Sequence, residues 1–238
     1  MRFRRIIRYF KRGNVSVCGL RGRGKDMLMA NVVVRRKKPY VSNVDYGGEW
    51  IQFDPAAISL SGNTYKNFLS GDVNPYCFPY EDGTDFYISD AGVYFPSQYC
   101  AELNRQYPHL PAFMALTRHL GDCNFHYNVQ NLNRCWDKIR EQSDIYIMCR
   151  RCIVIFGIVL QFVRIYEKYD SVVSAAPPFP VRKPWLNSDR RLWWELSNAQ
   201  YLCSHGKIRS AFLIYRNKSS YDTRIFKTML EVTPDEKT

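Results

Sequence analysis

Residues 14–26 read NVSVCGLRGRGKD, and this stretch decides the fold. The apolar, β-branched run 14–18 predicts a short buried strand, and the residues from about 26 to 37 predict a helix. Between them lies G-x-x-x-x-G-K, in which three glycines let the backbone N–H groups face an anion while the helix N-terminus favours negative charge. The stretch therefore predicts a phosphate-binding loop, with Lys25 reaching the β- and γ-phosphates of a nucleotide.

The expected nucleotide contacts form one continuous segment. It comprises Gly19, Leu20, Arg21, Gly22, Arg23, Gly24, Lys25, Asp26 and Met27. The position after the lysine departs from the motif, because a magnesium-binding Ser or Thr is usual there and Asp26 stands in its place. A carboxylate can bind Mg²⁺, but it also brings negative charge close to the phosphates, which Arg21 and Arg23 can offset.

A second element of the same site is expected on an apolar strand that ends in an acid. The run FYISD at 86–90 fits, and its Asp90 is the predicted second magnesium ligand. Many ATPases carry a Glu at the next position to orient the attacking water, whereas this chain has Ala91. The substitution predicts slow hydrolysis or a carboxylate supplied from elsewhere.

The rest of the chain continues the alternation of strands and helices. Strands are expected at 40–44, 86–90, 123–129 and 145–149, a hairpin at 152–168 and a strand-like run at 211–215, while residues 50–80 show no clear periodicity. The fold class is therefore α/β: a P-loop NTPase with a mainly parallel sheet flanked by helices and a small β-rich and helical C-terminal extension. The expected organisation is a basic arm over 1–12, the NTPase domain over 13–174, a Pro-rich linker over 175–189 and a helical extension over 190–238.

The charge is concentrated at the N-terminus. Of the formal net charge of +12, residues 1–38 hold 13 basic residues and one acid, while the remaining residues balance. This distribution argues against a uniformly basic packaging protein. No apolar run is long enough to cross a bilayer.

Cysteine usage predicts free thiols rather than a disulfide framework. Eight cysteines in 238 residues are too sparse for such a scaffold. The pairs Cys149/Cys152 and Cys123/His126 have metal-like spacing, but both are expected in strands, where residues three apart point to opposite faces. We therefore expect buried thiols rather than a zinc site.

The order of several motifs resembles a known family. GLRGRGKD at 19–26, FYISDAGVYFPSQ at 86–98 and TRHLGDCNFHYNVQNLNRCWDKIREQSDIYIMCRR at 117–151 resemble the zonular occludens toxin-like family, the assembly ATPases of filamentous phages that are related to the FtsK/HerA group. YDTR at 221–224 is similar to the closing segment of that family. The resemblance covers roughly residues 13–168.

The resemblance implies an ATPase that uses ATP and Mg²⁺, forms a homo-oligomer and works with other phage assembly proteins. It implies that Lys25 binds phosphate, that Asp90 serves the metal and that Gln130 is a polar sensor beside the γ-phosphate. It also implies that Arg140 is an arginine finger for a neighbouring subunit. From the residues alone, Gln130 is equally a surface amide at a strand end, and Arg140 equally an ion-pair partner of nearby acids.

The N-terminal helix and the overall function each leave alternatives open. Residues 2–12 form a cationic amphipathic helix that suits an anionic membrane surface, suits DNA, or docks on the domain through Phe3, Ile6 and Phe10. The leading function is a phage ATPase that couples ATP binding and hydrolysis to virion assembly or DNA extrusion, in the host cytoplasm or peripherally at the inner membrane. The alternatives are a nucleotide-binding scaffold with little hydrolysis and a DNA-packaging or DNA-binding protein.

Overall fold

The structure is a computed structural model that describes residues 3–55, 83–108, 110–116, 123–167 and 208–219. Within these residues one eight-stranded sheet runs through the molecule in the order β3-β2-β4-β5-β1-β6-β7-β8. The strands are β1 (Val15–Cys18), β2 (Tyr40–Ser42), β3 (Trp50–Gln52), β4 (Asp85–Ile88), β5 (Phe125–Val129), β6 (Ile145–Ile155), β7 (Ile158–Glu167) and β8 (Ile208–Arg216). All pairings from β3 to β6 are parallel, and the two outer pairings, β6–β7 and β7–β8, are antiparallel.

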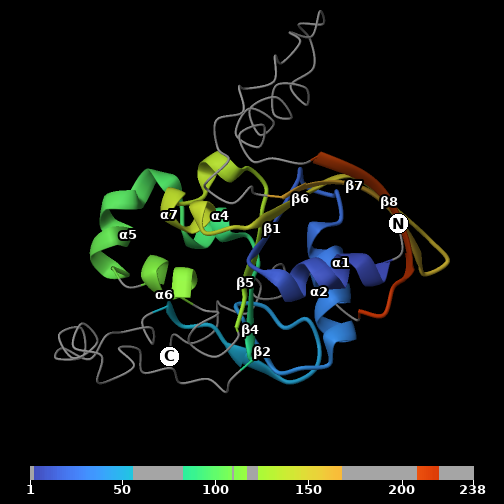
Figure 1. The fold of residues 1–238 in the computed structure, drawn as a ribbon, viewed down its shortest axis with the longest axis horizontal. Coiled ribbons are helices and arrows are strands. Elements are labelled where there is room, and N and C mark those ends of the chain that lie inside the picture. The colour runs from blue at the N-terminus through green and yellow to red at the C-terminus, as the bar shows by residue number, and fades with distance from the viewer. Residues whose placement is uncertain (1–2, 56–82, 109, 117–122, 168–207, 220–238) are drawn as a thin grey trace, which may run out of the picture.

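Helices cover both faces of the parallel part of the sheet. Figure 1 shows α1 and α2 on one side and α4 to α7 on the other. The helices are α1 (Phe3–Arg12), α2 (Lys25–Arg36), α4 (Ala91–Tyr94), α5 (Cys100–Gln106), α6 (Leu110–Leu116) and α7 (Asp137–Glu141), with 3₁₀ turns η2 (Ser97–Tyr99) and η3 (Leu132–Arg134). The predicted fold class, a mainly parallel sheet flanked by helices, is confirmed.

Two hydrophobic cores lie on the two faces, because alternate residues of each strand point to opposite sides. In β4, Phe86 and Ile88 belong to the core under α4 to α7, whereas Tyr87 belongs to the core under α1 and α2. Helix α1 contributes its apolar side to the second core, where Ile6 and Phe10 are fully buried. The docked arrangement of this helix is thus the one that the structure shows.

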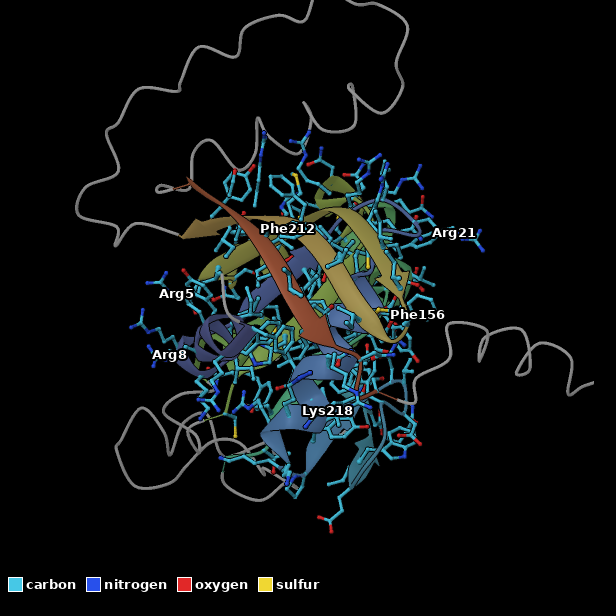
Figure 2. All side chains as sticks on the ribbon, turned by 90° about the vertical axis from the view of Figure 1, so that its right-hand side faces the viewer. Arg5, Arg8, Arg21, Phe156, Phe212 and Lys218 are labelled. Carbon is cyan, nitrogen blue, oxygen red and sulfur yellow. The ribbon has the colours of Figure 1, made fainter. Side chains whose placement is uncertain are left out.

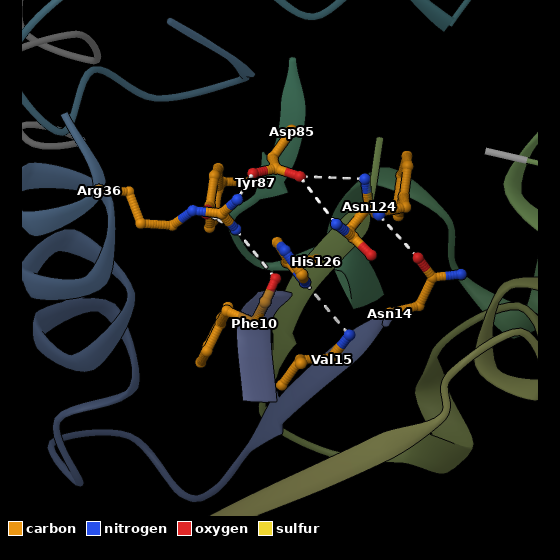
Figure 3. A network of polar contacts seen from close by, with 9 residues as sticks. Phe10, Asn14, Val15, Arg36, Asp85, Tyr87, Asn124 and His126 are labelled. Atoms are coloured by element: carbon orange, nitrogen blue, oxygen red, sulfur yellow. Dashed lines mark hydrogen bonds and ion pairs between the residues drawn. The ribbon is translucent and has the colours of Figure 1, made fainter. Parts of the chain in front are cut away.

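A buried polar network closes the ends of the strands opposite to the glycine-rich loop (Figure 3). Arg36, at the end of α2, forms an ion pair with Asp85 and donates to the hydroxyl of Tyr87 (3.2 Å). The other carboxylate oxygen of Asp85 accepts from the backbone N–H (3.0 Å) and the side-chain amide (3.1 Å) of Asn124. Burial of both charges is thereby compensated by direct partners, and the network ties α2 to β4 and β5.

His126 belongs to the same network, and it accepts a hydrogen bond at Nδ1 from the backbone N–H of Val15 (3.2 Å). Burial, with a further contribution from Arg36, holds the pKa of His126 well below its ordinary value. A neutral imidazole is what an acceptor at Nδ1 requires. The histidine of the CxxH pair is therefore a structural residue between β1 and β5.

One strand differs from what the sequence predicts. Strand β3 was not expected, because the three residues Trp50–Gln52 carry no periodic signal and are recruited by parallel pairing with β2. The strand-like run at 211–215 is confirmed as β8, which pairs with β7. The proposed linker at 175–189 lies outside the described residues, and the division of the chain into domains stays a prediction. None of the described helices is long and apolar enough to cross a membrane.

Candidate functional site

The glycine-rich loop lies between the end of β1 and the start of α2. Strand β1 occupies the middle of the sheet, between β5 and β6, so the loop emerges at the carboxyl edge of the parallel strands, where α/β proteins bind ligands. The loop closes on itself through a bond from the N–H of Arg23 to the carbonyl of Leu20 (3.2 Å). It is joined to β5 through a bond from the N–H of Gly19 to the carbonyl of Val129 (3.3 Å).

Gly24 is required by two features at once. Its φ of 76° lies in the left-handed region, and a Cβ at this position would stand 2.6 Å from Sγ of Cys152. Gly24 is also the N-cap of α2, and no side-chain hydrogen bond caps the helix there. The first N–H groups of a twelve-residue helix therefore remain available to an anion at the loop.

Lys25 begins α2, and it is 96% buried, with a relative exposure of only 4%. A buried ammonium group is costly unless an anion or acceptor compensates for it. Its charge lowers the pKa of the buried thiol of Cys18, although burial is the larger influence and raises that pKa to about 12. The lysine thus lies at the base of the loop, where a phosphate would supply the compensating charge.

Asp26 is held in place by polar side chains from β5 and from the end of β4. Its Oδ1 accepts from Nδ2 of Asn128 (2.6 Å) and from Oγ of Ser89 (3.0 Å). The other amide atom of Asn128, Oδ1, accepts from the backbone N–H of Asp90 (2.9 Å). One buried amide therefore fixes both acidic residues that the sequence singled out.

Asp90 follows β4 and stands in the left-handed region, with φ of 46°. Burial, followed by the negative charge of Asp26, raises its pKa, while Lys25 and Arg21 act in the opposite direction. The negative charge of Asp26 next to the buried carboxyl of Asp90 is electrostatically unfavourable, and a divalent cation would relieve it. The structure thus places the two residues predicted as metal ligands close enough to interact electrostatically.

The remaining predicted residues lie farther out. Gln130 directly follows β5 and is exposed. Arg140 lies on α7, half-buried, and donates to the carbonyl of Leu132 (3.3 Å) in its own chain. Arg21 is exposed, while Leu20, Arg23 and Met27 are partly buried. The catalytic roles of Gln130 and Arg140 stay predictions.

A residue that the sequence did not single out supports the loop from below. Gln161, fully buried on β7, donates from Nε2 to the carbonyls of Gly24 (3.0 Å) and Arg23 (3.2 Å). Its Oε1 accepts from the hydroxyl of Tyr215 on β8 (2.9 Å). The outer antiparallel strands are therefore hydrogen-bonded directly to the glycine-rich loop. The only sequence signal was a glutamine inside an apolar strand.

The expectation that Cys149 and Cys152 point to opposite faces is wrong. A β-bulge between Cys149 and Arg151 shifts the pairing of β6 with β7, so that Cys152 stands opposite Gln161. Nε2 of Gln161 also lies 3.3 Å from Sγ of Cys149, so both thiols face the loop. The extra residue of a bulge reverses the side-chain alternation. Burial raises the pKa of both thiols, and among the described residues no group of three or more His, Cys, Asp or Glu side chains could hold a metal ion.

Comparisons with known proteins found likenesses among solved structures alone. No family model matches the chain, and no curated protein matches it. The N-terminal domain of zonular occludens toxin from Neisseria meningitidis is 11% identical over 90% of this chain and 97% of that chain, with a TM-score of 0.47. The genome packaging NTPase B204 from Sulfolobus turreted icosahedral virus 2, solved in complex with ATP-gammaS, is 12% identical over 66% of this chain and 92% of that chain, with a TM-score of 0.39.

A third likeness is to the Legionella pneumophila ATPase DotB, which is 10% identical over 71% of this chain and 50% of that chain, with a TM-score of 0.34. At identities of 10–12% the roles of residues are not transferred from these proteins to this chain. By these comparisons the chain is similar in structure to the N-terminal domain of zonular occludens toxin and to a viral genome packaging NTPase.

Proposed function

We propose that this protein is a zonular occludens toxin-like P-loop ATPase that binds ATP with Mg²⁺ at the loop after β1. The observation that carries the proposal is the pair Asp26 and Asp90, joined through the single amide of Asn128 beside the uncapped N-terminus of α2. This edge offers N–H groups and the Lys25 ammonium to phosphates, and two carboxylates to a cation. The residues thus fit ATP and magnesium.

Each residue of the site has a distinct task in this proposal. The loop N–H groups and Lys25 hold the β- and γ-phosphates, and Arg21 and Arg23 offset the charge of Asp26. The Asp26 and Asp90 carboxylates bind the cation, which neutralises charge on the phosphates when it is present. Such loops usually provide a Ser or Thr hydroxyl to the cation, and here the carboxylate of Asp26 takes that place. Asn128 and Ser89 orient this carboxylate.

Gln130 is proposed to orient the attacking water at the end of β5. That strand lies between the strand of the loop and the strand that leads to Asp90, so its carboxyl end adjoins both. Arg140 is proposed to act on the nucleotide of a neighbouring subunit, which requires its guanidinium to leave the carbonyl of Leu132. A homo-oligomer working with other phage assembly proteins, in virion assembly or DNA extrusion, completes the proposal.

The test is ATP binding and steady-state hydrolysis by the full chain, with Lys25→Ala as the variant and the exposed Lys138→Ala as the matched control. We expect Lys138→Ala to behave as wild type and Lys25→Ala to lose both binding and turnover. Removal of one phosphate-contacting charge typically costs a factor of about 10² or more in rate. If wild type neither binds nor hydrolyses ATP, the proposal is wrong.

A second candidate function, a nucleotide-binding scaffold with little hydrolysis, is favoured by one specific position. Ala91, where many ATPases carry a water-orienting Glu, is fully buried and has no group that could take a proton. Clear ATP binding together with turnover equal to that of Lys25→Ala would establish the scaffold and exclude the enzyme.

The basic face of α1 is proposed to bind a polyanion, either anionic lipid or DNA. Its apolar face is engaged in the core, so Arg4, Arg5, Arg8, Lys11 and Arg12 form the exposed side. Binding to either partner should then be electrostatic and weaken steeply with salt. Salt titrations with anionic vesicles and with duplex DNA distinguish the two partners.

A further inference from the structure

The β6–β7 hairpin ends in an apolar tip, which we call the finger and define as residues 153–158. Its exposed apolar side chains are Ile153 (46%), Val154 (48%), Ile155 (48%), Phe156 (101%) and Ile158 (45%). A strand that covers a core exposes alternate residues, but three successive residues here are exposed. Both faces of the strand are thus in contact with solvent.

The turn of the finger contains a residue that turn geometry disfavours. Phe156 and Gly157 both have positive φ, 48° and 73°, as the two central residues of a type I′ hairpin turn do. Asn or Asp is favoured at the first of these positions, and a bulky aromatic residue there is strained. The fully exposed ring of Phe156 therefore serves neither the turn nor the core, which points to an external ligand.

The strands that carry the finger are basic and contain no acid over residues 145–166 and 208–219. Around the base of the finger the exposed side chains of Arg151, Arg216 and Lys218 supply positive charge. Arg216 stands opposite Ile158 in the β7–β8 register. The N–H of Asn217 donates to the carbonyl of Gly157 (2.7 Å), which fixes the segment bearing Lys218 beside the turn.

We propose that the finger inserts into the surface of an anionic lipid bilayer. An apolar tip next to Arg and Lys side chains matches acyl chains next to negative headgroups. The one acid in β6, β7 and β8 is Glu167, which lies at the end of β7 far from the finger. A second copy of this chain would bring the same positive charges against themselves. Nucleic acid would match these charges but would leave most of the five apolar side chains in water.

This site differs from the basic face of α1, and it does not depend on nucleotide binding. Helix α1 packs against β8 through Phe3 and Tyr215, whose ring centroids lie 4.3 Å apart. Figure 2 shows Arg5 and Arg8 on the far side of β8 from Phe156. The finger supplies the apolar insertion that α1 cannot provide, because the apolar face of α1 is buried.

The test is co-sedimentation of the full chain with vesicles of phosphatidylcholine and phosphatidylglycerol in equal parts, and with vesicles of phosphatidylcholine alone. The variant is Phe156→Asn, which suits the left-handed turn position, so the fold should be kept or stabilised while the ring is lost. The matched control is Tyr99→Asn, which removes another exposed aromatic ring, on η2. Circular dichroism melts of all three proteins check folding.

We expect wild type and Tyr99→Asn to bind the anionic vesicles. We expect Phe156→Asn to bind them at least roughly tenfold more weakly, as the loss of one buried aromatic ring implies. Binding should fall on neutral vesicles and in high salt. Equal binding by Phe156→Asn overturns the proposal. The proposal is also overturned if wild type binds no vesicles but self-associates in light scattering, and Phe156→Asn loses this self-association. The finger would then bind a second copy of the chain. Binding of wild type to duplex DNA but not to anionic vesicles, lost in Phe156→Asn, also overturns it.

Discussion

Replacement of Gln161 by leucine tests whether the outer strands hold the glycine-rich loop in its conformation. Leucine is similar in volume, so the core around β7 stays filled. The hydrogen bonds of the side-chain amide to the loop and to Tyr215 are lost. The carbonyl of Gly24 keeps a bond from the N–H of Leu28 (3.0 Å). The main losses are therefore at the carbonyl of Arg23 and at the hydroxyl of Tyr215.

Each buried polar group that loses its partner costs about 1–3 kcal/mol, so the substitution should cost roughly 2–6 kcal/mol of the free energy of unfolding. For a chain of this size each kcal/mol lowers the melting temperature by about 2–4 °C, which makes the shift easy to detect. The freed loop should also bind ATP more weakly, because its N–H groups no longer stand preorganised. Thermal melts with and without ATP and Mg²⁺ measure both effects.

A double-mutant cycle with Tyr215→Phe adds the decisive control. When Gln161 is already leucine, the tyrosine hydroxyl has lost its acceptor, so its removal should then cost little or should stabilise. The coupling between two residues in contact is typically about 0.5–3 kcal/mol. Additive effects of the two substitutions, or an unchanged melting temperature and ATP response in Gln161→Leu, would refute the reasoning.

Three further predictions concern the site and its support. The pKa of Asp90 is raised in the folded protein, so the free energy of unfolding should fall as the pH rises above the pKa that this carboxyl has in the unfolded chain. Asp90→Asn should remove this pH dependence and stabilise the metal-free protein at neutral pH, and thermal melts in EDTA from about pH 4 to about pH 8 measure the effect. Gly24→Ala should destabilise the loop and abolish ATP binding, and Cys152→Gly should restore part of the stability by removing the atoms 2.6–2.8 Å from the new Cβ, but not the left-handed strain. Asp85→Asn should leave Arg36 buried without its charge partner and cost roughly 3–5 kcal/mol in urea unfolding.

Each of these has a contrary outcome. A pH profile of Asp90→Asn parallel to that of wild type would show that another group titrates. Failure of Cys152→Gly to improve Gly24→Ala would place the cost in the backbone conformation alone. Wild-type stability of Asp85→Asn would show that a neutral partner for Arg36 is sufficient in the network of Figure 3.

The parallel half of the fold could be predicted because local pattern and tertiary context agree there. The segment from β1 through the loop to α2 carries its own strand, turn and helix signals, and the structure places them accordingly. Strand β3 could not be predicted, since three residues with two exposed side chains form a strand only because β2 offers an unpaired edge. Its pairing is a tertiary property that no window of sequence contains.

In the site, the sequence identified Asp26 and Asp90 but neither Asn128, which contacts both acids, nor Gln161, which supports the loop. Acids at strand and helix ends are visible in a pattern, whereas Asn128 and Gln161 are buried polar residues inside strands and resemble any polar interruption. The register that brings Gln161 beneath the loop depends on the bulge in β6, and a bulge follows from the pairing of two strands. The error about Cys149 and Cys152 has the same physical origin.

Because of the bulge, the number of residues in β6 determines which side chains face the loop. Deletion of its single extra residue would restore regular alternation, and every side chain from there to the tip of the finger would change sides relative to the loop. Insertions of two residues near the tip would instead lengthen the finger and preserve its faces. Natural variation in this hairpin should therefore come in steps of two beyond the bulge, while the bulge itself keeps its place opposite Phe162 and Val163.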